Sequence, residues 1–246
     1  MLSCLNKKEF LTRIKNNGFY PEFIIDCGFG METKGLFENF PNSKKVIIEP
    51  IVEAIPFMED FCKNNSNSKF YNIALSDFIG DIEITYRPGI TGSSIHRGEI
   101  TNSEKRKVET STLDQMIKVN DLKGLGLLKL DVEGHEWRVL QGAKNSLNIF
   151  EVIIIEISMW PKENEPDVKT FFEYSDFFYQ NNYVLYDILE LGYRKIDSAL
   201  QQFDAVFIKK DSILRKTKKM KTKKQGEDSL NHKYNKYLNK LKNLGL

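Results

Sequence analysis

Four short and almost entirely apolar runs constrain the fold of this 246-residue chain more than any other feature. They are FIIDCG (23–28), KVIIEP (45–50), LGLLKLDV (125–132) and EVIIIEI (151–157). Apolar runs of this length, with little polar alternation, are typical of strands that are covered on both faces, as in parallel sheets. Segments with helical character separate the runs. We therefore predict an α/β fold with a doubly wound, mostly parallel sheet.

Further strands and helices are predicted around these runs. The additional strands are 69–75, 81–87, 183–190 and 204–210, and the helices are 110–118, 136–147 and 167–182. The last two strands follow each other closely, so we expect them to pair antiparallel at one edge of the sheet. In the last helix, we expect the aromatic residues to lie mostly in the core. The long polar segment over 88–107 is predicted to be a loop.

Charge divides the chain unevenly, although its formal net charge is only +2. Residues 211–246 contain eleven Lys and Arg but only three Asp and Glu, whereas acidic residues predominate slightly in 1–210. We therefore predict a helical lead-in over 1–22, a main domain over 23–210 and a basic, partly helical tail over 211–246. The mildly acidic main domain is not expected to bind nucleic acid, but the tail is suited to an anionic membrane surface.

Three features favour a cytoplasmic protein. No run approaches the roughly eighteen apolar residues of a membrane-spanning helix. The first residues, MLSCLNKKEF, are polar where a signal peptide needs its apolar region. Cys4, Cys27 and Cys62 show no metal-ligand spacing, so we expect three reduced thiols and predict no metal site.

Acidic residues and glycines stand at the carboxyl ends of the predicted strands. They are Asp26, Gly28 and Gly30, then Glu49 and Pro50, then Ser76 and Asp77, then Asp131 and Glu133, and finally Glu156. Ligands bind open parallel sheets beyond the carboxyl ends of the strands, near the point where the strand order reverses. We therefore predict a ligand site at this edge of the sheet.

Three of these strand ends together favour a ligand that carries adenosine. Gly28 allows the backbone to approach a ligand closely, and Glu49 is placed to accept hydrogen bonds from two ribose hydroxyls. Asp77 is placed to meet the adenine amino group. Taken singly, Glu49 is equally consistent with a solvated acid at a strand end, and Asp77 with a turn residue before Gly80.

The glycine patterns that bind phosphate groups are missing from the sequence. There is no GxxxxGK[ST] motif, and in GFGMET (28–33) other residues occupy the place of the third glycine of GxGxxG. An acid beside this turn would also repel a pyrophosphate. A nucleoside without phosphates fits better, and we predict S-adenosylmethionine as the cofactor.

Several segments resemble the FkbM family of S-adenosylmethionine-dependent methyltransferases. The most specific are STLDQMIK (111–118) and LLKLDVEGHEWRVLQGA (127–143), which are similar to the family's T-L-D and K-x-D-V-E-G-x-E-x-x-V-L-x-G-A motifs. IIDCGFG, VIIEP, NIALSDFIGDIEI and TGSSI also resemble family segments. The resemblance covers roughly residues 23–157. It implies a Rossmann-like class I methyltransferase fold with a seven-stranded sheet.

The resemblance also implies which residues hold the cofactor. Asp26, Gly28 and Gly30 would hold the methionine end, Glu49 the ribose and Asp77 the adenine side. We also place Pro50, Ser76 and Ser94 in the cofactor site, with Ser93 or Ser94 at the methionine carboxylate. One departure concerns DCGFGMETK (26–34), which is about two residues shorter than the family pattern and has Phe29 in place of a small alanine. This departure predicts a narrower cofactor pocket.

Lys129, Asp131, His135 and Glu156 are the candidate catalytic residues. Methyl transfer aligns a nucleophile with the methyl group, and a base helps when a hydroxyl proton must leave. Asp131 is our first choice, because it stands where the strand reaches the cofactor. His135 titrates in the useful range, with a surface position at a helix start as its alternative role. The charged cluster as a whole is alternatively a structural ion-pair network.

Glu133, Ser93 and Trp160 are candidate contacts for the substrate. Ser93 and Ser94 lie in GITGSSIHRG (89–98), our candidate for the loop on the substrate side. Glu133 precedes a helix, whose amino terminus favours a negative charge. Trp160 follows a strand end and offers an aromatic face to a sugar ring, or else packs under the next helix.

Three functions remain open on the sequence. The first is an O-methyltransferase acting on a hydroxyl of a sugar, a glycan precursor or a small metabolite. The second is an RNA 2′-O-methyltransferase, which the basic tail and the Lys, Asp and Glu cluster motivate. The third is a glycan-binding module of weak activity, in which the shortened glycine loop no longer holds the cofactor.

Overall fold

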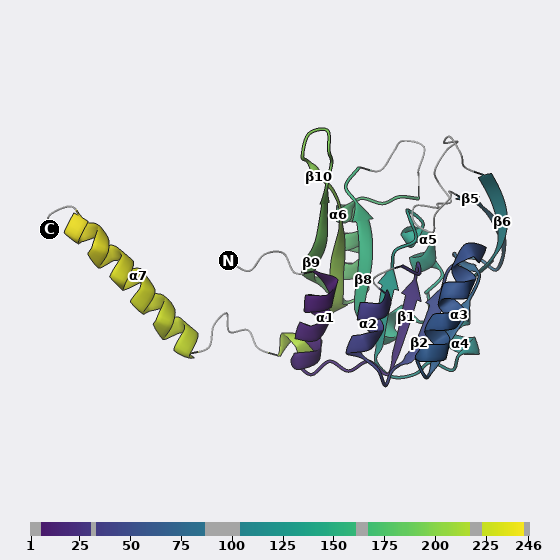
Figure 1. Ribbon diagram of the computed structural model, residues 1–246, viewed down its shortest axis with the longest axis horizontal. Coiled ribbons are helices and arrows are strands. Elements are labelled where there is room, and N and C mark those ends of the chain that lie inside the picture. The colour runs from purple at the N-terminus through teal and green to yellow at the C-terminus, as the bar shows by residue number, and fades with distance from the viewer. Residues whose placement is uncertain (1–5, 31–32, 87–103, 161–166, 217–222, 244–246) are drawn as a thin grey trace. The chain divides into compact units, whose positions relative to one another are not determined.

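The computed structural model describes residues 6–30, 33–86, 104–160, 167–216 and 223–243. Its contacts divide the chain into two units, residues 1–213 and 214–246. The first unit contains two sheets and the helices that cover them (Figure 1). The second contains one long helix, which is described separately below.

The main sheet has seven strands in the order β3-β2-β1-β7-β8-β10-β9. They are β1 (Phe23–Cys27), β2 (Lys44–Ile48), β3 (Ser68–Tyr71), β7 (Gly126–Leu130), β8 (Phe150–Ser158), β9 (Tyr183–Tyr193) and β10 (Leu200–Lys209). The first five strands in space are parallel, and β10 is antiparallel to both of its neighbours. The predicted fold class, with antiparallel pairing at one edge, is confirmed.

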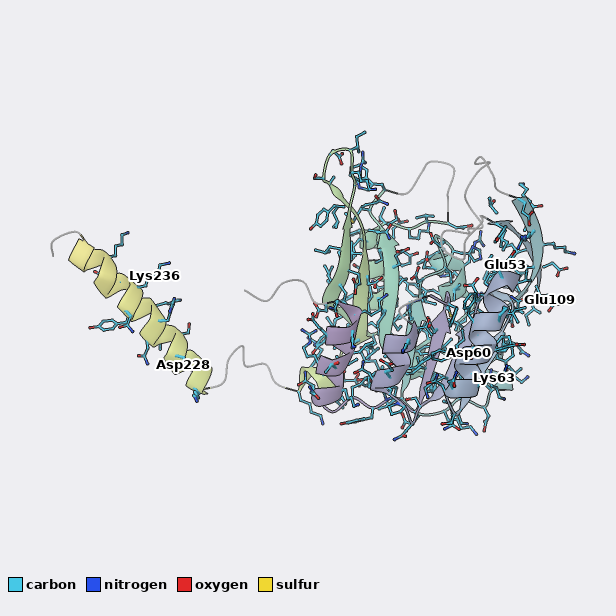
Figure 2. All side chains as sticks on the ribbon, in the orientation of Figure 1. Glu53, Asp60, Lys63, Glu109, Asp228 and Lys236 are labelled. Carbon is cyan, nitrogen blue, oxygen red and sulfur yellow. The ribbon has the colours of Figure 1, made fainter. Side chains whose placement is uncertain are left out.

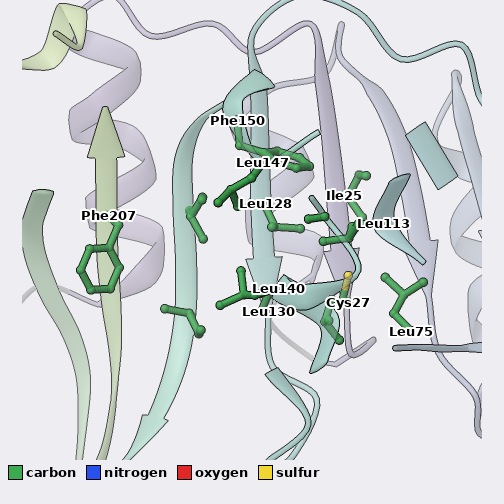
Figure 3. Close-up of a cluster of buried hydrophobic side chains, with 14 of the residues drawn as sticks. Ile25, Cys27, Leu75, Leu113, Leu128, Leu130, Leu140, Leu147, Phe150 and Phe207 are labelled. Atoms are coloured by element: carbon green, nitrogen blue, oxygen red, sulfur yellow. The ribbon is translucent and has the colours of Figure 1, made fainter. Parts of the chain in front are cut away.

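Helices cover both faces of this sheet, which explains why its central strands are largely apolar. Helices α1 (Lys7–Asn16), α2 (Thr33–Asn39) and α3 (Ile55–Asn64) lie on one face, and α4 (Leu113–Val119), α5 (Glu136–Gln141) and α6 (Phe171–Gln180) on the other (Figure 1). All five residues of β1 and of β7 are buried. Figure 3 shows the core on the second face, where Ile25, Leu128 and Leu130 pack with Leu113 and Leu140.

The helices begin at caps that the sequence supplies. Asn6 and Glu9 form a capping box at the start of α1, and Thr170 and Glu173 form one at the start of α6. The Thr112 side chain accepts a hydrogen bond from the Gln115 amide and caps α4, which therefore begins at Leu113 rather than at the predicted residue 110. Short 3-10 helices span Val52–Ala54, Leu147–Ile149 and Ile213–Arg215.

A second sheet of three strands corrects two predictions. It contains β4 (Ala74–Leu75), β5 (Gly80–Tyr86) and β6 (Glu104–Ser111) in the order β4-β6-β5. The predicted strand over 69–75 is divided between β3 and β4, because the chain leaves the main sheet at Asn72, whose side chain bonds to the Glu49 carbonyl at 2.9 Å. The predicted loop over 88–107 is wrong at its end, since residues 104–107 belong to β6. The rest of that loop lies outside the described residues.

One further helix prediction is corrected and another is confirmed. Helix α5 ends at Gln141 rather than Leu147, and the chain turns at Gly142, where a Cβ would overlap the Ser76 carbonyl oxygen. In α6, most of the aromatic residues belong to the core as predicted: Tyr174 and Phe178 are buried and Phe171 and Phe177 pack against that core, whereas Phe172 is 79% exposed.

The second unit contains helix α7 (Lys223–Asn243). Its described side chains include exposed Leu230, Tyr234 and Tyr237, together with Lys236 and Asp228 (Figure 2). No helix among the described residues is both long and apolar enough to cross a membrane.

Candidate functional site

The carboxyl ends of the parallel strands meet at one edge of the main sheet (Figure 1). Asp26 on β1, Glu49 after β2, Asp131 after β7 and Glu156 on β8 therefore lie at this edge. The strand order reverses between β1 and β7, which is where open α/β sheets bind ligands. The predicted site residues of these four strands are thus brought to one place by the topology.

A tight contact joins the turn after β1 to the turn after β7. Gly28 has a φ of 93°, and a Cβ at this residue would overlap the Asp131 carbonyl oxygen. The Asp131 amide donates to the Cys27 carbonyl at 3.0 Å. The glycine is therefore needed both for its backbone conformation and for the close approach. At Gly30, by contrast, a Cβ would meet no described atom within 4 Å.

Lys129 links the two turns electrostatically. Its Nζ lies 3.2 Å from Asp26 Oδ1 and 3.4 Å from Asp131 Oδ2, and it donates to the Gly28 carbonyl at 2.9 Å. Thr33, at the start of α2, donates to Asp26 Oδ2 at 2.6 Å. Burial lowers the pKa of Lys129, but the carboxylates of Asp26 and Asp131 outweigh burial and hold that pKa above its usual value. Lys129 therefore keeps its charge and organises this turn.

Glu49 is buried, with 7% of its surface exposed, which rules out a solvated acid at a strand end. Its carboxyl oxygens accept hydrogen bonds from the Phe29 amide at 3.1 Å and the Ile51 amide at 2.9 Å. Burial raises the pKa of Glu49 to about 7. Because a carboxylate offers about four acceptor positions, capacity remains for ribose hydroxyls. Pro50, which follows, is half-buried.

The Phe29 side chain lies against α3. Its ring meets that of Phe61 edge-on, with centroids 6.3 Å apart. Met31 and Glu32 lie outside the described residues, so the predicted narrowing of the pocket stays a prediction.

Ser76, Asp77 and His135 form one hydrogen-bonded chain. The His135 Nε2 lies 3.1 Å from Ser76 Oγ, which in turn bonds to Asp77 Oδ1 at 3.1 Å. Arg138 donates to Asp77 Oδ2 at 3.0 Å. Burial raises the pKa of Asp77, but the bonds from Arg138 and Ser76 outweigh it and lower that pKa overall. His135 is only 3% exposed, so the alternative of a surface residue is wrong.

The turn between β7 and α5 is held by Glu136, which the sequence did not single out. Its Oε1 accepts from the amides of Val132 at 2.9 Å and Gly134 at 3.2 Å. Burial raises the pKa of Glu136 to about 7. Glu133 has a φ of 55° and therefore lies outside the alternation of the strand, which ends at Leu130.

Glu156 joins this acidic group from β8. Its Oε1 accepts a hydrogen bond from Gln202 Nε2 at 2.7 Å, and it pairs directly with Asp204 across β8 and β10. Burial, followed by the nearby carboxylates of Asp131, Glu136, Glu133 and Asp204, raises the pKa of Glu156 to about 9. Asp204 was not predicted, although an acid at the start of an antiparallel strand reaches the same edge.

Trp160 packs against the hairpin of β9 and β10 rather than under the next helix. Its Nε1 donates to the Leu200 carbonyl at 2.7 Å, and the Arg194 guanidinium lies 4.4 Å from the ring centroid. About half of Trp160 remains exposed. Ser93 and Ser94 lie outside the described residues. Among the described residues, no three His, Cys, Asp or Glu are grouped as a metal site.

A family model matches more than half of this chain. The Methyltransferase FkbM domain matches residues 26–195. The hexuronic acid methyltransferase AglP of Haloferax volcanii is 30% identical over 83 residues, which is 34% of this chain and 34% of AglP, so the aligned segment spans about a third of that relative.

Solved structures of low sequence identity were also matched. The 23S rRNA methyltransferase ErmE is 10% identical, with a TM-score of 0.43 over 87% of this chain and 73% of that chain. The precorrin-6y C5,15-methyltransferase of Geobacter metallireducens GS-15 is 9% identical, with a TM-score of 0.42 over 85% of this chain and 92% of that chain.

Proposed function

This chain belongs to the Methyltransferase FkbM domain family, and we propose that it transfers the methyl group of S-adenosylmethionine to a hydroxyl of a sugar, a glycan precursor or a small metabolite. The observation that carries this proposal is the meeting of the Gly28 turn, Glu49 and Asp131 at the point where the strand order reverses. The match to a hexuronic acid methyltransferase supports a sugar acceptor.

The residues present fit the proposed cofactor. The absence of a side chain at Gly28 lets the Asp131 carbonyl pack against it, so the turns after β1 and β7 are held together at the site, and the buried Glu49 retains acceptor positions for a diol. Asp26, Gly28 and Gly30 would hold the methionine end, and Ser76 and Asp77 would lie at the adenine side. When bound, S-adenosylmethionine supplies a methyl group already activated by its sulfonium.

Asp131 is the proposed base and positioning group for the acceptor. Its side chain is 32% exposed and is anchored by Lys129, so it can reach a bound hydroxyl. The new O–C bond forms as the C–S bond breaks, and the hydroxyl proton passes to the Asp131 carboxylate. Glu156, whose pKa is raised to about 9 by burial and neighbouring carboxylates, is protonated at neutral pH and can donate a hydrogen bond to the acceptor oxygen.

A change of one carboxylate tests this function. Asp131→Asn should reduce methyl transfer to a sugar panel by roughly 100-fold or more, because the base is lost while the shape is kept. Asp121→Asn, in an exposed turn, is the matched control and should be fully active. Full activity of Asp131→Asn would contradict its role. Failure of the wild-type protein to bind S-adenosylmethionine in calorimetry would favour the glycan-binding module instead.

The tail offers a separate surface for a partner. Leu230, Tyr234 and Tyr237 are 69%, 62% and 59% exposed, and their spacing places them on one side of α7. Lys233, Lys236 and Lys240 on the same helix are also exposed. An apolar stripe combined with lysines is typical of helices that lie on anionic membranes. We therefore propose peripheral membrane contact through α7.

Vesicles separate this proposal from RNA binding. The full chain should sediment with vesicles that contain phosphatidylserine but not with neutral vesicles, and removal of residues 214–246 should abolish sedimentation. Tail-dependent, salt-sensitive binding to RNA without vesicle binding would instead support the RNA 2′-O-methyltransferase.

A further inference from the structure

We propose that Lys7 and Asp204 are positioning residues for the acceptor side of the site, so that helix α1 completes a site otherwise built from β7, β8 and β10. This inference rests on the proposed function, because it assigns both residues to the same reaction.

The ion pair between Lys7 and Asp204 is buried. Lys7 Nζ lies 2.7 Å from Asp204 Oδ2, and the two side chains are 7% and 6% exposed. The Lys7 amide also donates to Glu190 Oε1 on β9 at 2.6 Å, so both the backbone and the side chain of Lys7 are fixed to the hairpin. The capping box of Asn6 and Glu9 holds the helix end that carries Lys7.

Stability alone does not explain this pair. Removing two charges from water is expensive, and replacing a buried ion pair by apolar residues is often neutral or stabilising. We infer a functional reason for these charges from the residue opposite Asp204, which is Glu156 on β8.

Asp204 faces Glu156 directly. The two residues are partners in the antiparallel register of β10 and β8, so their side chains lie on the same face of the sheet. Gln202, two residues before Asp204, shares that face and donates to Glu156 Oε1 at 2.7 Å. Lys7, Asp204, Gln202 and Glu156 therefore form a continuous row from α1 to the carboxyl end of β8.

Asp204 is one of several carboxylates that, together with burial, set the electrostatic surroundings of Glu156. The acidic groups that face Glu156 are Asp131 and Glu133 after β7, Glu136 on α5 and Asp204 on β10. Two adjacent carboxylates do not both ionise readily, so a proton is retained where no cation compensates. Lys7 compensates Asp204, and Lys129, which interacts with both Asp131 and Asp204, compensates Asp131, so that the proton remains on Glu156. The pKa of Glu156, raised to about 9 chiefly by burial, agrees with this assignment.

The consequence for the reaction is a division of roles between two carboxyl groups. Glu156, held in one orientation by Gln202, presents a neutral acid to the acceptor oxygen, while Asp131 accepts the proton. Lys7 and Asp204 touch neither the acceptor nor the methyl donor in this arrangement. They act through Glu156, and their loss should affect the acceptor rather than the cofactor.

The full-length protein provides the test. Asp204→Asn keeps the shape of the side chain and removes its charge, and Lys7→Met combined with Asp204→Asn removes both charges without leaving one unpaired. The matched control is Asp187→Asn, because Arg13 and Asp187 form an ion pair between the same helix and β9 that is more exposed. Lys7→Arg should retain function.

The pKa of Glu156 distinguishes a positioning role from a purely structural one, because loss of a purely structural ion pair would leave that pKa unchanged. The ¹³C-labelled carboxyl of Glu156, assigned by the signal lost in Glu156→Gln, should titrate at lower pH in Asp204→Asn and in the double variant than in the wild-type protein. The KM for the acceptor should rise roughly tenfold or more, with the Kd for S-adenosylmethionine within twofold. Asp187→Asn should change neither value.

The possible outcomes separate the two proposals. An unchanged titration of Glu156 in both charge-removing variants, or an unchanged acceptor KM in both, would overturn the inference. Failure of the wild-type protein to methylate any acceptor would overturn the proposed function. This result is distinguishable from failure of the inference, because the titration of Glu156 is measured without methyl transfer.

Discussion

The backbone of Gly28 lies against the carbonyl group of Asp131, so closely that the two residues leave no room for a β-carbon between them. This contact joins the turns that follow β1 and β7, on either side of the point where the strand order reverses. The proposed cofactor site and the proposed base are therefore held in a fixed relation by a backbone contact. Both would move together if the contact were disturbed.

Gly28→Ala should disturb it. An alanine at a φ of 93° is strained by about 1–2 kcal/mol, and its β-carbon overlaps the Asp131 carbonyl oxygen. We expect a lower free energy of unfolding in urea and weaker binding of S-adenosylmethionine. Gly30→Ala is the control for stability, because its β-carbon meets no described atom within 4 Å. Equal unfolding midpoints for the two variants would contradict the proposed strain.

Lys129→Met should destabilise the protein by roughly 3–5 kcal/mol, because it leaves the fully buried Asp26 without its cation. Adding Asp26→Asn should recover part of that loss, since no unpaired charge then remains. Lys123→Met, which breaks an exposed pair with Asp121, should stay within about 0.5 kcal/mol of the wild-type protein. Urea unfolding of the wild-type protein, Lys129→Met, Asp26→Asn and the double variant measures the coupling, with Lys123→Met as the control. Additive losses in the double variant would show that Lys129 and Asp26 are not coupled.

The fold was predictable where burial leaves a simple pattern. Strands covered on both faces must be apolar, so β1, β2, β7 and β8 are visible as apolar runs. Strand β6 was not predicted, because charged residues fill its first half, where Lys105 and Lys107 pair with Glu83 and Asp81 on β5 rather than face a core. A strand stabilised by ion pairs across a small sheet carries no apolar signal.

The site was predictable as far as parallel topology determines it. Asp26, Glu49, Asp131 and Glu156 each end an apolar run, and parallel strands bring such ends together. Asp204 could have been found by the same logic, since the amino end of an antiparallel strand lies at that edge. Lys7 could not, because its contact depends on how α1 packs against a hairpin far along the sequence.

His135→Ala should lower stability more than catalysis, as expected if His135 has a structural role. His135 is buried and bonded to Ser76, so its removal leaves a buried hydroxyl with one partner fewer and costs about 1–3 kcal/mol. We expect a lower Tm and weaker binding of S-adenosylmethionine through Asp77, but little change in kcat at saturating cofactor. His232→Ala, on the exposed surface of α7, is the control. A loss of kcat of roughly 100-fold with unchanged Tm would instead support proton transfer by His135.

Glu156→Gln should change how stability depends on pH. Burial and neighbouring carboxylates raise the pKa of Glu156 to about 9 from an ordinary value of 4.5, so the folded protein holds this proton more tightly than the unfolded chain. The contribution of the protonated Glu156 carboxyl to the free energy of unfolding is fully present below pH 4.5, and it is lost as the pH rises through 9. Relative to Glu156→Gln, the wild-type protein should lose roughly 1.4 kcal/mol per pH unit across this window.

Glu173→Gln provides a control of opposite sign. Hydrogen bonds from Thr170 hold the pKa of Glu173 below its usual value, so its stabilisation is present above that range and lost only on acidification. Between pH 5 and pH 9, the difference in unfolding free energy between the wild-type protein and Glu173→Gln should therefore be constant. The difference from Glu156→Gln should change steadily over the same interval. A flat difference for Glu156→Gln as well would mean that Glu156 ionises normally and is no hydrogen-bond donor at neutral pH.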